Sequence, residues 1–176
     1  MGLLFLLGTY YIQEESIREI RKEKNGTILS HRGFPAGQPY NRTLNSAIIR
    51  IKDLHTTVGT KAVVFVKFTS EFDIFANNAK TSCDDVLHIG NEKSQRWIDY
   101  CNNKKPPLDV WIPHATSTLN DTFFFWLVLS SELPASTKAV GFSLEYSGTR
   151  RQEIFLLLFN HFAGCRYSDC YAVHTV

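Results

Sequence analysis

The feature that most constrains the fold is a series of short apolar or alternating runs, each bounded by turn-forming residues. The runs cover residues 27–30, 48–51, 62–68, 108–112, 123–129 and 140–146. They are four to seven residues long, which is typical of strands and too short for most helices. Such runs with intervening turn signals predict an all-β antiparallel sandwich. We expect an edge strand at 27–30, a central strand at 62–68 and a buried strand at 123–129.

Two cysteines enclose the middle of this pattern. Cys83 comes just before the apolar run at 86–89, and Cys101 closes the segment. The simplest interpretation is a structural disulfide, which for a loop of this size stabilises by about 3 kcal/mol. A catalytic cysteine would need a histidine beside it. His88 lies five residues from Cys83, so on a strand it faces the opposite side.

Composition and motifs exclude several classes of function. The 176 residues carry a formal net charge of +2 with no long basic run, which argues against nucleic-acid binding. The chain contains no Gly-x-Ser-x-Gly, no Gly-rich phosphate loop and no His-Glu-x-x-His. We therefore expect a binding protein and no enzymatic activity.

Both ends differ from the centre. Residues 1–11 are apolar but too short to span a bilayer, so we consider a signal-peptide remnant, a buried strand or a truncated gene product. Residues 13–24 are dense in charges of both signs, which favours a short exposed helix or a solvated linker. The apolar segment at 153–162 is also too short to cross a membrane. We expect three parts: 1–24, a sandwich domain at 25–148, and 149–176 as a tail or the start of another module.

Glycosylation sequons and the C-terminal cysteines bear on the compartment. Acceptor sequons begin at Asn25, Asn41 and Asn120, which favours the secretory route, with unmodified surface asparagine as the alternative. The tail spaces two histidines and two cysteines as His161-x3-Cys165-x4-Cys170-x3-His174. These four side chains suit tetrahedral zinc, but the compact spacing disfavours it. A Cys165–Cys170 disulfide is the main expectation, with unpaired or intermolecular thiols as further alternatives.

Residues 25–146 resemble a CUB domain, an extracellular β-sandwich module. The resemblance starts at Gly26-Thr27-Ile28-Leu29-Ser30, followed by Gly33-Phe34-Pro35 and Tyr40. It continues through 68–74, then Cys83-Asp84-Asp85-Val86-Leu87-His88-Ile89 and Tyr100-Cys101, and closes with 125–131 and Gly141-Phe142-Ser143-Leu144-Glu145-Tyr146. It implies that Cys83 and Cys101 form the second disulfide of that family. The first family disulfide is absent, because Ala47 stands where a cysteine is expected and none precedes Cys83.

The resemblance also points to a calcium site. Many CUB domains bind calcium through one glutamate and two aspartates on neighbouring loops, and calcium needs six to eight oxygen ligands. Asp85 matches the first aspartate and Glu132 stands in place of the second, but Phe75 replaces the glutamate. The site is therefore weakened, and the alternative is that both acids are solvated loop residues.

The function implied is recognition of an extracellular protein or glycan by loops between strands. The candidate contact residues are Tyr40, Arg42, Phe75, Asp85, Glu132 and Lys138. One alternative is a non-catalytic accessory domain of a larger extracellular protease or receptor. Another is a small intracellular β protein whose cysteines stay reduced or bind zinc in the tail. We expect no membrane span and no required cofactor, and the sequence indicates no oligomeric state.

Overall fold

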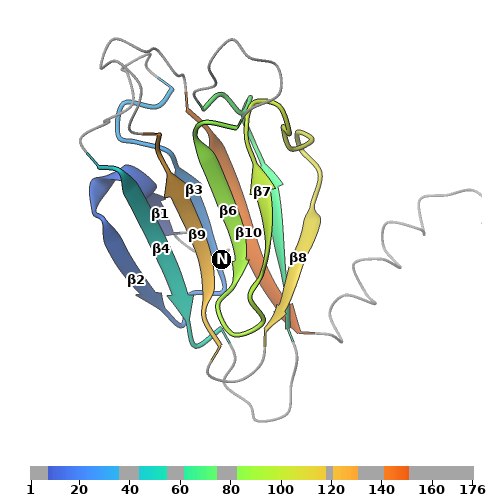
Figure 1. Cartoon of the computed structure of the whole chain (residues 1–176). Helices are drawn as coiled ribbons and strands as arrows, with labels where there is room; N and C mark the ends of the chain where they lie inside the picture. The colour runs from blue at the N-terminus through green and yellow to red at the C-terminus, as the bar shows by residue number, and fades with distance from the viewer. Residues whose placement is uncertain are drawn as a thin grey trace, which may run out of the picture.

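The computed structural model describes residues 8–35, 44–54, 62–74, 83–117, 121–130 and 141–150. Two five-stranded sheets lie face to face (Figure 1). The first sheet has the order β1-β3-β10-β5-β8 and the second has the order β2-β4-β9-β6-β7. The strands are β1 Gly8–Tyr11, β2 Ile17–Arg21, β3 Asn25–Leu29, β4 Ser46–Lys52, β5 Ala62–Phe68, β6 Val86–Asn91, β7 Arg96–Tyr100, β8 Ile112–Ser117, β9 Phe123–Val128 and β10 Ser143–Arg150, and a 3-10 turn η1 covers Ile12–Glu14.

Each sheet has one parallel pair at one edge and antiparallel pairs elsewhere. β1 runs parallel to β3 in the first sheet, and β2 runs parallel to β4 in the second. The chain crosses from one sheet to the other at η1, so its first two strands contribute one edge to each layer. Within the described segments, the structure contains no helix of the length and apolar character needed to cross a bilayer.

The core lies between the sheets and is rich in aromatic rings. At one end Phe68 packs edge-on against Tyr100 and Phe72, with ring centroids 5.2 and 5.6 Å apart. Farther along, Phe125 packs against Tyr146 at 5.7 Å. In the strands, Phe68, Phe125 and Tyr146 alternate with outward-facing neighbours, which is the period-2 pattern of strands with one buried face. The predicted sandwich is therefore confirmed.

Several local predictions were wrong. Residues 27–30 do not form an edge strand, because β3 lies between β1 and β10. The predicted strand at 108–112 starts only at Ile112, and the side chains of Leu108, Val110 and Trp111 are exposed. The buried strand expected at 123–129 forms as β9, although Trp126 on its outer face is 38% exposed.

The charged segment at 13–24 is not an exposed helix or linker. Ile17–Arg21 forms β2, the edge strand of the second sheet, with Ile20 buried in the core. The i,i+4 pair that suggested a helix does form, with 2.9 Å between Arg18 and Glu14, but it joins η1 to the strand. A charged edge strand needs few apolar positions and discourages pairing with another chain.

Candidate binding surface

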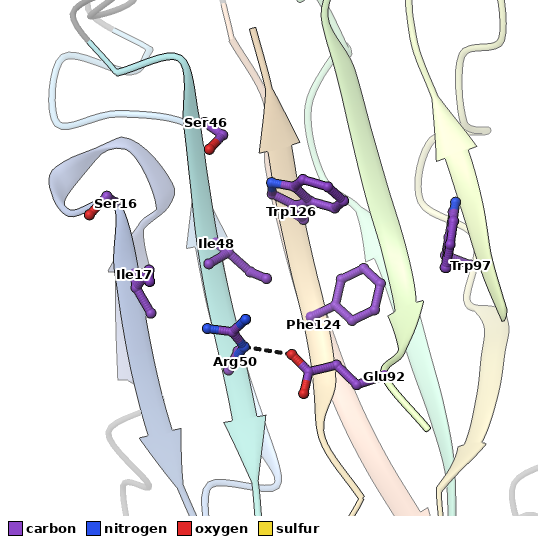
Figure 2. A pocket seen from close by; sticks show the side chains of 9 residues that line it. All are labelled: Ser16, Ile17, Ser46, Ile48, Arg50, Glu92, Trp97, Phe124 and Trp126. Atoms are coloured by element: carbon purple, nitrogen blue, oxygen red, sulfur yellow. Dashed lines mark hydrogen bonds and ion pairs between the residues drawn. The ribbon is translucent and has the colours of Figure 1, made fainter. Parts of the chain in front are cut away.

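A groove crosses the outer face of the second sheet. Its volume is about 450 Å³, which is in the range of small-ligand sites. Figure 2 shows Phe124 and Trp126 on its floor, between Ile48 on β4 and Trp97 on β7. The lining residues are Ser16, Ile17, Ser46, Ile48, Arg50, Glu92, Trp97, Phe124 and Trp126.

Strand register brings the apolar side chains into one row. Ile17 on β2 is paired with Ile48 on β4, Ile48 with Trp126 on β9, and Trp126 with His88 on β6. Neighbours in such a row lie on the same face and contact one another. The His88 imidazole also lies 5.1 Å from the Trp126 ring and 6.3 Å from the Trp97 ring, so it fills the space between the two indoles.

A second row positions Trp97. Arg50, Phe124, Gly90 and Trp97 occupy successive strands. A Cβ atom on Gly90 would lie 2.5 Å from the Cβ of Trp97, so only glycine leaves room for the indole beside it. Trp97 then reaches Phe124, with ring centroids 6.3 Å apart, and Phe124 is almost completely covered.

The charged groups around the groove are paired. Arg50 donates to Glu92 at 2.5 Å, and this pair lies at one end of the aromatic floor (Figure 2). His88 contacts Asp99 at 2.6 Å. Lys52 donates to Glu19, which holds the pKa of that carboxyl below its usual range.

Buried polar contacts hold the β6–β7 turn that carries Glu92. Asn91 donates to Asp121 at 2.5 Å and accepts from the backbone N–H of Ser94 at 3.1 Å. The Glu92 N–H donates to the Thr122 carbonyl at 3.0 Å. Since Asn91 and Asp121 are both buried, these bonds fix the turn to the start of β9.

The predicted disulfide residues lie at the other end of the same hairpin. Cys83 and Cys101 are bonded in the structure, with Cα atoms 5.5 Å apart. Cys83 precedes β6 and Cys101 follows β7, so the bond closes the open end of this antiparallel pair. Ala47, at the position of a family cysteine, is buried in β4.

Asp85 does not lie on the surface as a loop contact. It is fully buried, and its carboxylate accepts from the Ser130 N–H at 2.8 Å, which ties the start of β6 to the end of β9. The other positions of the predicted calcium site, Phe75 and Glu132, lie outside the described residues. Among the residues that the structure describes, no three metal-binding side chains converge.

The remaining sequence candidates fall mostly outside the described segments. These are Tyr40, Arg42, Lys138, the sequons at Asn41 and Asn120, and the tail residues His161, Cys165, Cys170 and His174. Asn25 is described and exposed at the start of β3, and its side chain accepts from the Ser147 hydroxyl at 2.7 Å. Its glycosylation remains a prediction.

Sequence reasoning missed the groove, although two signals pointed to it. The run Phe123-Phe124-Phe125-Trp126 has apolar residues at every position. A strand in a two-layer sandwich buries only alternate residues, so half of that run must face outward. The second signal was Gly90 in an apolar run, since glycine inside a strand often marks a close approach.

The comparisons with known proteins bear on the fold. No family model matches the chain, and no curated protein matches it. The solved structure of the CUB1-EGF-CUB2 domains of rat MASP-1 aligns with 76% of this chain at TM-score 0.50 and 15% identity. The corresponding human MASP-1/3 structure aligns with 77% at TM-score 0.46 and 17% identity.

The fold is CUB-like. The identity is too low to extend the likeness beyond the fold. The chain spans 42% of each of these solved structures. The groove of the CUB-like sandwich is therefore interpreted from this chain's own residues.

Proposed function

We propose that this chain is an extracellular, non-enzymatic binding module that recognises a protein or glycan ligand. The observation that carries the proposal is the exposure of large apolar side chains in one groove: Ile17 is 56% exposed, Trp97 49% and Trp126 38%. Large apolar side chains gathered on a soluble surface usually mark an interaction site.

The sandwich would act as a rigid support for this surface. Trp97 and Trp126 project from hydrogen-bonded strands and are packed against Phe124 and His88. Side chains held in this way lose little conformational entropy on binding, which leaves more of the contact energy for affinity. Partly buried tryptophans with a covered apolar support are also typical energetic centres of binding surfaces.

The extracellular part of the proposal has separate support. The Cys83–Cys101 bond is of a kind that persists in oxidising compartments. Intact mass of protein secreted from eukaryotic cells, alkylated with and without reduction and before and after deglycosylation, tests this part. We expect at least one bridge and attached glycan. Free Cys83 and Cys101 without glycan would contradict secretion.

The groove itself can be tested without knowing the ligand. Multimerised secreted protein would be applied to a panel of cell lines and its surface binding measured by flow cytometry. We expect Trp126→Ala to weaken binding by about 30-fold or more, the effect of losing a central aromatic contact.

The matched control is Trp111→Ala. Trp111 is 44% exposed, and it covers Lys67 of the first sheet with 5.0 Å between the ammonium and the ring centroid. Loss of binding in both variants, or in neither, would contradict recognition at the groove. Recognition through the predicted loop residues Tyr40, Arg42, Phe75 and Lys138 would then be the better hypothesis.

A further inference from the structure

We infer that the groove binds a neutral carbohydrate whose ring faces stack on Trp97 and Trp126. This rests on the proposed function and names the ligand class for the same groove. The C–H face of a pyranose ring carries slight positive charge, and the face of an indole carries the negative part of its quadrupole. Two exposed indoles line this groove, Trp126 on its floor and Trp97 at its β7 side, and they therefore offer stacking positions for sugar rings.

Charge in the groove favours a neutral ligand. Glu92 is paired with Arg50. Asp99, next to the groove, contacts His88. A charged ligand bound at either pair would compete with a partner that is already in place. A ligand without charge can leave both pairs intact.

Hydrogen-bonding groups surround the aromatic floor. The Arg50 guanidinium supplies donors and the Glu92 carboxylate supplies acceptors, at one end of the floor (Figure 2). The hydroxyls of Ser16 and Ser46, which can donate or accept, line the opposite part. Sugar hydroxyls also both donate and accept, so an apolar floor with such a border suits their chemistry better than it suits an apolar peptide.

The size of the groove also favours a small ligand over a protein surface. Its volume of about 450 Å³ is at the lower part of the range for small-molecule sites. A stable protein partner needs roughly 800 Å² of surface from each side. Beside the row of Ile17, Ile48 and Trp126, the outer face of the second sheet carries the charged pair of Glu19 and Lys52. Charged pairs are more typical of the rim of a protein interface than of its core.

The tryptophans allow a direct test because the chain has only three. Trp111→Phe leaves the two groove indoles as the only indole fluorophores. Binding to an array of neutral, sialylated and sulfated oligosaccharides would first identify candidate sugars. Enzymatically deglycosylated Trp111→Phe protein would then be titrated with the corresponding neutral methyl hexosides and disaccharides. We expect a saturable change in tryptophan emission for at least one neutral sugar. The double variant Trp97→Phe/Trp126→Phe, which keeps only Trp111, should show no emission change.

Further variants assign the contacts. Trp126→Ala and, as a second variant in case the first misfolds, Trp97→Ala should each weaken array binding at least about tenfold, since a stacking contact with an aromatic ring is worth about 1–3 kcal/mol. Arg50→Gln and Glu92→Gln should weaken it several-fold while their melting curves stay close to that of the parent. Lys67→Gln, on the opposite outer face, should leave binding unchanged.

The outcomes separate this inference from the proposed function. Binding only to sialylated or sulfated sugars would overturn the neutral-ligand inference. A protein ligand would be identified by three results together: cell binding that needs Trp126, cell binding that survives glycosidase treatment of the cells, and no binding to the oligosaccharide array. These results would overturn the carbohydrate inference and keep the proposed binding function. A dimer that Trp126→Ala dissociates, without sugar binding, would assign the groove to a second copy of this chain. Absence of both cell and array binding would overturn both proposals.

Discussion

The outer faces of the two sheets occupy equivalent positions, and their central rows differ in chemistry. On the first sheet, register aligns Thr27, Glu145 and Lys67 across β3, β10 and β5, and Lys67 pairs with Glu145 at 2.9 Å. On the outer face of the second sheet, register aligns Ile17, Ile48 and Trp126 across β2, β4 and β9. The row on the first sheet interacts with water through charges and a hydroxyl, whereas the row on the second sheet exposes apolar side chains.

This difference shows which apolar residues the fold requires. A sandwich needs one apolar face on each sheet, and both inner faces supply it. The outer apolar face of the second sheet contributes less to the core, because Ile17, Trp97 and Trp126 on it remain partly exposed. The proposed binding function rests on this outer face.

The sharpest test of this distinction uses two adjacent residues. Phe125 is fully buried and faces the core, whereas Trp126 faces outward. We expect Phe125→Ala to lower the free energy of unfolding by about 3–5 kcal/mol through cavity formation. Trp126→Ala should lower it by only about 1–2 kcal/mol, because part of its surface already contacts water. Urea unfolding followed by circular dichroism measures both, and equal losses would show that the outer face is part of the folding core.

A second prediction concerns the hairpin that carries Trp97 and His88. The Cys83–Cys101 bond closes this hairpin at the end opposite its turn. We expect Cys83→Ser/Cys101→Ser to lower the unfolding free energy by about 3 kcal/mol. Hydrogen exchange should accelerate more in β7 than in β3, because β7 is the edge strand next to the lost bond. Uniform acceleration in both strands would show that the bond supports the whole sandwich equally.

The sequence predicted the fold better than it predicted the surface. The run 140–146 alternates as expected for a strand with one buried face, and the structure buries its alternate residues Phe142, Leu144 and Tyr146. The same reasoning failed at β2, where charges on the outer side concealed a strand with one deeply buried position, Ile20. Periodicity is a weak signal in an edge strand, because few of its residues reach the core.

The local signals at 123–126 and at Gly90 could not place the whole groove, because its assembly depends on long-range register. Ile17 and Trp126 are far apart in the sequence, and their alignment exists only once β4 has paired with both β2 and β9. The loop candidates were chosen from the resemblance to CUB domains. Of these only Asp85 lies in the described residues, and its burial could not be seen from its position beside Cys83.

Gly90 offers a smaller and more local way to alter the groove. We expect Gly90→Ala to lower the unfolding free energy by about 1–3 kcal/mol, because the new methyl group would overlap Trp97 and force β7 away. Burial of Phe124 under Trp97 should also be lost. Thermal melting gives the stability, and tryptophan emission in the Trp111→Phe background gives the position of the indole. Gly148→Ala is the matched control, since its nearest neighbour would lie at 3.3 Å; equal losses in both variants would contradict a specific role for Gly90.

The smallest expected effect lies where the two sheets meet. His114 on β8 contacts Tyr100 on β7, with 3.0 Å between its Nε2 and the hydroxyl. Its Nδ1 lies 2.9 Å from the Ile112 carbonyl, so Nδ1–H donates there and Nε2 is left to accept from Tyr100. Burial lowers the pKa of His114 below its usual value near 6.5 and raises the pKa of Tyr100. Folding therefore favours neutral His114.

The sign of the pH dependence follows from this preference. Below about pH 6.5 the unfolded chain binds a proton at His114 before the folded chain does, so stability falls as the pH is lowered. His114→Gln removes this titration, and its unfolding free energy should decline less between pH 7.5 and 5.5 than that of the parent. Carboxylates that titrate in the same range are common to both proteins and cancel in the difference. Parallel curves would mean that His114 stays neutral in both states or gains its proton equally in both, and the junction of the two sheets would then be insensitive to pH.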